Sequence, residues 1–149
     1  MMFNFIPAIA ASLLVQGASA QQVDLLAASN SSQYTSIPIR LLTHNIRYNA
    51  TSLFDGEAPW ETRRPRLTRE LRFNTESPPE SFICMQEVLN NQLLDILTDL
   101  NQGNTTKEWT YIGVGRNDGK TQGEYSPLFY RPAIWDLTSF RTEIGRAHV

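Results

Sequence analysis

The spacing of hydrophobic residues predicts a series of short strands and amphipathic helices from residue 37 onward. Apolar side chains alternate at the start of segment 37–46 and then occur on both faces, which is typical of a strand inside a sheet. Residues 55–59, Asp-Gly-Glu-Ala-Pro, have the composition of a loop. Pro65 suits the first turn of the helix that follows, and Leu67 and Leu71 are predicted to lie on its buried face.

The second part of the chain continues with the same kinds of element. Phe82–Val88 is predicted to be a strand, and Asn90 is a suitable N-cap for the helix after it. Apolar residues recur in this helix at spacings of three and four, which predicts one apolar face: Leu93, Leu94, Ile96, Leu97 and Leu100. Three more strands are predicted over Trp109–Val114, Ser126–Tyr130 and Trp135–Phe140. This order of strands and helices predicts an α/β fold with a mixed sheet.

The first 20 residues have the composition of a secretory signal peptide. Residues 3–20 carry no charged side chain, and Ala18-Ser19-Ala20 matches a small-residue cleavage site. The apolar stretch is too short for a convincing membrane-spanning helix, which needs about 20 apolar residues. A buried or anchoring helix is the alternative interpretation. Residues 21–36 are rich in Gln, Ser, Asn and Ala and are predicted to be a flexible leader.

Three N-glycosylation sequons and a single cysteine bear on the route of export. The sequons begin at Asn30, Asn49 and Asn104, and none has proline in the middle position. Each sequon alone also arises by chance, but together with a signal peptide they predict a secreted, extracellular glycoprotein. Cys84 has no partner for an internal disulfide. Its apolar neighbours favour a buried residue of a core strand over a reactive thiol.

Composition and charge restrict the class of protein further. The chain has 149 residues, 41% of them hydrophobic, and a net charge of −2, which indicates one modest globular domain and excludes a disordered chain. The acidic balance argues against a protein that coats polyanions. One predicted helix carries a run of arginines, which we interpret as a solvated surface in preference to a nucleic-acid patch: Arg63, Arg64, Arg66, Arg69 and Arg72.

Polar residues follow the apolar strands near their C-terminal ends, where α/β sheets build their sites. Asn45, Glu87 and Glu124 are the principal ones. Amide and carboxylate oxygens suit Mg²⁺, whereas two histidines and one cysteine offer no convincing zinc site. From the residues alone, a turn-forming amide at Asn45 and a helix N-terminal acid at Glu87 are the favoured interpretations.

Several whole phrases in order change this interpretation: Leu42-Thr43-His44-Asn45-Ile46-Arg47-Tyr48, Trp60 followed by Arg63-Arg64, Met85-Gln86-Glu87, residues 111–120 (Tyr-Ile-Gly-Val-Gly-Arg-Asn-Asp-Gly-Lys), and residues 123–131 (Gly-Glu-Tyr-Ser-Pro-Leu-Phe-Tyr-Arg). Together they resemble the endonuclease/exonuclease/phosphatase superfamily, from about Arg40 to Phe140. The resemblance implies a four-layer α/β sandwich and Mg²⁺- or Mn²⁺-dependent cleavage of phosphate esters.

The resemblance also implies roles for particular residues. Asn45 and Glu87 match the metal-site pair, and Glu124 matches the acid that supports the catalytic histidine. Asn117 departs from the family pattern, where many relatives have Asp, so Asp118 is the carboxylate that this loop keeps for catalysis. His44 is interpreted as structural. Arg116 and Lys120 are candidate phosphate contacts in the glycine-containing loop 113–119, because small residues allow a close backbone approach.

The resemblance covers only the N-terminal part of such a domain, which we place at residues 37–143. The second half, with its Asp-x-Asn and Asp-His phrases and the catalytic base, is not in this sequence. Residues 144–149 back-translate to a common sequencing adapter, so we interpret them as a non-biological tail. The fragment is expected to fold poorly and to be inactive.

These observations support two functional hypotheses. The first is a secreted metal-dependent phosphoesterase acting on a nucleic acid or a small phosphorylated metabolite, with no transmembrane segment and no stable protein partner implied. The alternative is a secreted, non-catalytic binding glycoprotein on the same fold, which the departure at Asn117 and the absent second half keep open.

Overall fold

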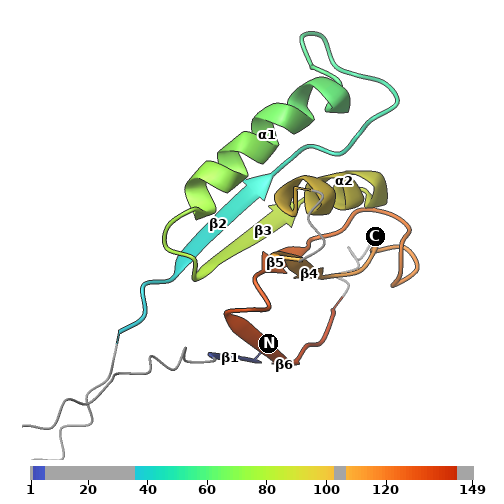
Figure 1. The fold of residues 1–149 in the computed structure, drawn as a ribbon. Helices are drawn as coiled ribbons and strands as arrows, with labels where there is room; N and C mark the ends of the chain where they lie inside the picture. The colour runs from blue at the N-terminus through green and yellow to red at the C-terminus, as the bar shows by residue number, and fades with distance from the viewer. Residues whose placement is uncertain (1, 6–35, 103–106, 144–149) are drawn as a thin grey trace, which may run out of the picture. The chain divides into compact units, whose positions relative to one another are not determined.

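The computed structural model describes residues 2–5, 36–102 and 107–143 (Figure 1). Apart from residues 2–5 and Ser36, the predicted signal peptide and leader lie outside the described residues, as do Asn30, Asn104 and the predicted tail at 144–149. Residues Met2–Phe5 form strand β1, which pairs antiparallel with β6 (Trp135–Ser139). Within the described residues, neither helix has the length and apolar character needed to cross a membrane.

A four-stranded mixed sheet is the centre of the fold. Its strands are β2 (Arg40–Asn45), β3 (Ser81–Gln86), β4 (Thr110–Ile112) and β5 (Leu128–Tyr130), in the order β2-β3-β5-β4. Strands β2 and β3 are parallel, and the other two pairings are antiparallel. The predicted α/β fold with a mixed sheet is confirmed. The four-layer arrangement remains a prediction, because the described strands form only this sheet and the β1–β6 pair.

Helices α1 (Trp60–Thr75) and α2 (Asn90–Leu100) contribute to the larger of two hydrophobic clusters. Their apolar faces pack with the sheet side chains Ile83, Met85 and Phe129. Leu67 and Leu71 are buried, as the pattern of the helix predicted. In α2 the apolar face is narrower than predicted, because Leu94 is 50% exposed.

A second, smaller cluster lies on the other face of the sheet. It contains Phe82, Ile112, Tyr130 and Trp135. The ring centroids of Phe82 and Trp135 lie 4.9 Å apart. Successive residues of a strand point to opposite faces, so Phe82 belongs to this cluster while its neighbour Ile83 belongs to the helix side. The half-buried Cys84 lies on β3, where burial raises the pKa of its thiol, consistent with the predicted unreactive residue.

The ends of several elements differ from the sequence predictions. Helix α1 begins at Trp60, so Pro65 lies inside the helix and not in its first turn. The N-cap of α2 is Leu89, and the predicted cap Asn90 is already helical and accepts a hydrogen bond from the Tyr125 hydroxyl at 3.0 Å. The predicted strand 37–46 shortens to β2, because residues 36–39 have no strand partner in the described sheet.

The position of β2 is a further correction. The apolar pattern predicted an interior strand, but β2 lies at the edge of the described sheet. Leu42 packs on the helix-side core, whereas Leu41, on the opposite face, is 67% exposed. A strand with apolar residues on both faces is able to bury both. In the described residues, only one face of β2 is covered.

Ion pairs join the two helices and change the interpretation of the arginine run. The Arg64 guanidinium lies 2.7 Å from carboxylate oxygens of both Asp95 and Asp99. Trp60 donates through Nε1 to Asp95 at 2.8 Å. Arg64 therefore fastens α1 to α2, and the predicted solvated surface holds only for the other exposed arginines, Arg66, Arg69 and Arg72.

The ion pairs of Arg64 with Asp95 and Asp99 should make stability depend on pH in the acid range. The Arg64 hydrogen bond holds the pKa of the Asp99 carboxyl below its usual range. A lowered folded-state pKa contributes stability above the unfolded-state pKa of about 3.9, and that stability is lost as the pH falls through the folded-state pKa. We expect Asp99→Asn to lower the unfolding midpoint at pH 6 and to converge with the parent near pH 2. Urea titrations across this range test it, and a constant difference between the two proteins would contradict it.

Candidate functional site

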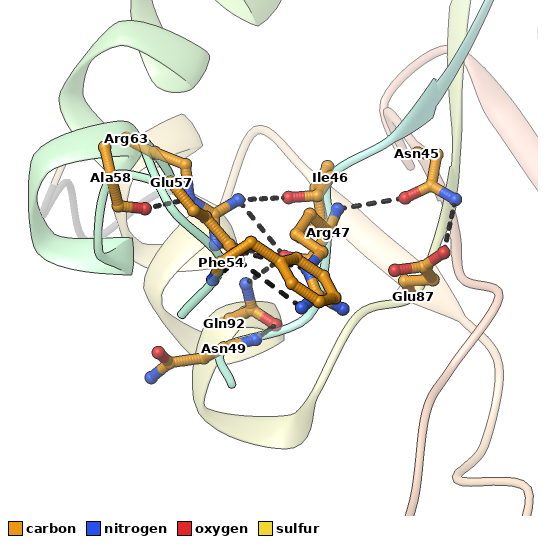
Figure 2. A network of polar contacts seen from close by, with 10 residues as sticks. All are labelled: Asn45, Ile46, Arg47, Asn49, Phe54, Glu57, Ala58, Arg63, Glu87 and Gln92. Atoms are coloured by element: carbon orange, nitrogen blue, oxygen red, sulfur yellow. Dashed lines mark hydrogen bonds and ion pairs between the residues drawn. The ribbon is translucent and has the colours of Figure 1, made fainter. Parts of the chain in front are cut away.

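Asn45 and Glu87 meet where two parallel strands end. Asn45 is the last residue of β2 and pairs in register with Gln86, the last residue of β3, so Glu87 follows directly beside it. The Asn45 side-chain amide donates to Glu87 Oε1 at 2.8 Å. Figure 2 shows the two side chains turned toward each other. The structure thus brings together the two residues that the sequence motifs paired.

The orientation of Asn45 is fixed by the turn that follows it. Its Oδ1 accepts a hydrogen bond from the Arg47 backbone amide at 2.9 Å, which directs the NH₂ group at Glu87. Arg47 has a φ of 56° and Glu87 a φ of 58°, so both chain segments turn through the left-handed region. Such conformations cost free energy in non-glycine residues and persist where the surroundings hold them.

The Arg47 side chain stabilises the loop that leaves this turn. It forms an ion pair with Glu57 at 3.0 Å, and its guanidinium lies over the rings of Tyr48 and Phe54, at 4.2 and 4.8 Å from their centroids. The hydrogen bond from Arg47 holds the pKa of the Glu57 carboxyl below its usual value. Arg47 therefore folds the loop back toward its own strand, and its charge is already paired.

Glu124 comes from the neighbouring part of the sheet. Val88 and Tyr125 form an antiparallel bridge, with Tyr125 N donating to Val88 O at 2.7 Å, so Glu87 and Glu124 each lie one residue from the bridge. The Glu124 carboxylate pairs with Arg116 at 3.2 Å. A hollow of about 370 Å³ lies beside it, lined in part by Phe140 and Arg141. Arg116 is thus occupied by a carboxylate in this structure.

Asp118 has a structural task in its loop. Its Oδ1 accepts the backbone amides of Lys120 at 2.8 Å and Gln122 at 2.9 Å. The hydrogen bond from Gln122, followed by that from Lys120, holds the pKa of Asp118 below its usual range. Asp118 thus accepts hydrogen bonds from the backbone of its own loop. The Asp118 carboxylate, which was predicted to be catalytic, therefore closes the turn. Lys120 lies in the same turn and is exposed.

The glycines of this loop permit close packing within the loop itself. A Cβ on Gly115 would lie 2.3 Å from the backbone oxygen of Gln122, and one on Gly123 would lie 2.6 Å from the Asn117 side chain. The glycines were predicted to allow a close approach to a phosphate. In this structure they allow parts of the loop to approach one another closely. His44, interpreted as structural, projects toward α1, where its Nδ1 lies 3.8 Å from Glu70.

Arg63 and Gln92 support the site and were not predicted to do so. Arg63 donates to the backbone oxygens of Ala58, Ile46 and Arg47, and Gln92 donates to that of Arg47 (Figure 2). The sequence offered one signal, the Trp60 and Arg63-Arg64 phrase of the resemblance. For Gln92 there was none, because a glutamine in a helix is usually exposed.

The donor set at the strand ends fits a hard cation. Glu87 is half-buried and Asn45 is exposed, and both lie where the parallel strands β2 and β3 end. Across the described residues, His, Cys, Asp and Glu side chains form no cluster of three or more that could hold a metal. Mg²⁺ commonly uses one or two carboxylates and takes its remaining ligands from waters and phosphates. The residues present are compatible with that mode of binding.

Comparisons with solved structures reveal relatives of this fold. No family model and no curated protein matches the chain. An endonuclease/exonuclease/phosphatase family protein from Bacteroides thetaiotaomicron matches with 28% identity and a TM-score of 0.55, over 66% of this chain and 33% of that one. A mannosyl-6-phosphatase from the same organism matches with 26% identity and a TM-score of 0.53, over 68% and 34%. An endonuclease/exonuclease/phosphatase from Bacteroides vulgatus has 41% identity and a TM-score of 0.48, over 62% and 31%.

The chain spans about a third of the length of each of these solved structures. The resemblance predicted from the sequence motifs is confirmed by the structural neighbours.

Proposed function

We propose that the protein carrying this chain, which has the fold and motifs of the endonuclease/exonuclease/phosphatase superfamily, is a metal-dependent hydrolase of phosphate esters. The observation that carries the proposal is the contact between Asn45 and Glu87 at the ends of two parallel strands. Ends of parallel strands are where α/β proteins place their ligands. The pair of oxygen-bearing side chains thus lies where a phosphoesterase-type α/β fold is expected to place its site.

Glu87 and Asn45 would hold Mg²⁺ or Mn²⁺, with Glu87 supplying the negative charge. When bound, such an ion neutralises phosphoryl oxygens and stabilises the leaving oxygen. In this chain, Asn45 orients the Glu87 carboxylate through its amide, and Glu124, which pairs with Arg116 here, is proposed to orient a basic group. Arg116 is a candidate phosphate contact once it exchanges Glu124 for substrate oxygens, as guanidinium groups bind both.

The substrate class that we propose is a phosphomonoester of a small polyol or sugar. One structural neighbour is a mannosyl-6-phosphatase. Arg63 and Arg64 of α1 are bonded within the structure, so they are not available to a nucleic acid. A phosphodiester or nucleic acid is the competing class, and the assay below separates the two.

Hydrolysis assays with and without metal test the proposal. We expect the whole protein that carries this chain to release phosphate from mannose 6-phosphate and p-nitrophenyl phosphate in Mg²⁺ or Mn²⁺, to act weakly on bis(p-nitrophenyl) phosphate, and to lose activity in EDTA. Activity should return when Mg²⁺ is restored, because chelation removes the ion without altering the fold of the sheet. Turnover that persists in EDTA would contradict metal dependence. Binding of these phosphates without turnover would favour the non-catalytic glycoprotein.

Export and glycosylation form a second part of the proposal. Asn49 is the sequon residue within the described part of the chain, and it is partly exposed. Figure 2 shows its side chain pointing away from Gln92, which holds its backbone amide at 3.0 Å. We expect protein secreted from a eukaryotic host to lose mass on treatment with an N-glycosidase, and Asn49→Gln to carry one glycan fewer. A secreted product with the mass of the bare polypeptide would contradict this.

A further inference from the structure

We infer that Gln92 is a positioning residue that ties together the two turns carrying Asn45 and Glu87. The inference rests on the proposed function for its consequence, but its structural content stands separately. Gln92 lies in the first turn of α2, and Figure 2 shows its side chain directed at the segment that follows β2.

The side-chain amide of Gln92 forms its hydrogen bonds with the backbone of these turns. Its Oε1 accepts from Leu89 N at 3.1 Å, two residues after Glu87, and from Asn49 N at 3.0 Å. Its Nε2 donates to the Arg47 carbonyl at 3.1 Å, two residues after Asn45. The side chain is 0% exposed, so water cannot replace these bonds in place. A single buried amide therefore connects the chain segments that follow β2 and β3.

The Arg47 carbonyl is held from a second direction as well. Both terminal nitrogens of Arg63 lie 3.2 Å from it, so α1 and α2 converge on one backbone oxygen. Arg47 is left-handed, and its own amide donates to Asn45 Oδ1. Loosening this carbonyl frees the dihedral angles of Arg47, which then no longer fix the direction of its amide.

The consequence passes through Asn45 to Glu87. If the Arg47 amide turns away, Asn45 loses the bond that directs its NH₂ group, and its 2.8 Å bond to Glu87 is no longer enforced. Glu87 is affected from its own side too, since Leu89 N loses its partner. Residues that orient metal-binding groups in this way usually change metal affinity or activity by about 10–100-fold when replaced.

Asn101 provides a matched control, because it performs the same kind of task at the opposite end of α2. Its side chain donates to the carbonyls of Leu97 at 2.9 Å and Trp109 at 3.1 Å, and accepts from Trp109 N at 2.8 Å. Replacing Asn101 by Leu removes a comparable set of backbone contacts without touching the turns after β2 and β3.

The experiment uses the whole protein that carries this chain, labelled with ¹⁵N, and reads the side-chain amide resonances of Asn45, assigned from their loss in Asn45→Asp. Glu87→Ala gives the reference position for an Asn45 amide that has lost its carboxylate partner. We expect Gln92→Met to move the Asn45 resonances toward that reference, and Asn101→Leu to leave them in place at a similar fall in Tm. Mn²⁺ affinity, from the EPR signal of the free ion, should fall about 10–100-fold in Gln92→Met and stay within about twofold in Asn101→Leu.

Gln92→Glu keeps the volume and both accepted hydrogen bonds while losing the donor to Arg47. It should move the Asn45 resonances part of the way, and it decides the matter if Gln92→Met does not fold. Unchanged Asn45 resonances in a folded Gln92 variant would overturn the inference. A parent protein that binds no Mn²⁺ would overturn the proposed metal site instead, and the Asn45 resonances would still decide the role of Gln92.

Discussion

In the whole protein that carries this chain, replacing Glu87 by Gln is expected to lower kcat/KM for a phosphomonoester at least about 100-fold while leaving Tm nearly unchanged. The reason is that the substitution removes the negative charge proposed to hold the ion but keeps the shape of the side chain. The replacement oxygen can still accept the Asn45 amide that Glu87 accepts at 2.8 Å. Charge stabilisation by a bound ion is worth several kcal/mol in the transition state, and each ~1.4 kcal/mol is tenfold in rate.

Glu76→Gln is the matched control, since Glu76 is exposed at the C-terminal end of α1. It removes one carboxylate charge from the protein and should leave kcat/KM within about twofold. The Mg²⁺ concentration for half-maximal activity should rise in Glu87→Gln and stay constant in Glu76→Gln. Equal activity of the two variants would show that Glu87 does not hold the ion, and the site would have to be sought around Glu124.

Sequence patterns predicted which helices and strands form more accurately than they predicted where each one begins and ends. Local periodicity identified the helices and strands because burial of one face is a property of the segment itself. The start of α1 at Trp60 was missed because proline is tolerated inside a helix when the chain before it is held, and Pro59 rather than a polar cap precedes it. The edge position of β2 depends on which strands lie beside it, and no local pattern contains that information.

The same distinction applies to the site. The Asn45–Glu87 contact was predictable from motifs because both residues end strands, and neighbouring parallel strands bring their ends together. Asp118 illustrates the limit: a carboxylate in a glycine loop reads equally well as a catalytic group and as the acceptor that closes the turn. Gln92 and Arg63 act across 45 and 16 residues of sequence on the Arg47 carbonyl. Their roles appear only when α1 and α2 are placed against the turns.

Arg131→Met is expected to reduce the free energy of unfolding by about 3 kcal/mol. Arg131 is only 8% exposed, and its guanidinium joins three segments. It donates to the carbonyl of Thr75 at 2.9 Å, to that of Pro79 at 2.8 Å, and to Glu108 at 2.8 Å. Methionine fills similar space but leaves the two carbonyls without donors, and each unsatisfied buried group costs about 1–3 kcal/mol. Urea unfolding followed by tryptophan fluorescence measures the loss.

Two further variants separate the hydrogen bonds from the charge. Arg131→Lys should recover only part of the stability, because one ammonium group cannot reproduce the planar fork that serves three acceptors and stacks on Trp109 at 4.0 Å. Arg72→Met removes an exposed arginine of α1 and should cost less than about 0.5 kcal/mol. If Arg131→Met cost no more than Arg72→Met, the end of α1 would be held by the packing of Trp109 alone. If Arg131→Lys matched the parent, charge would outweigh geometry at this junction.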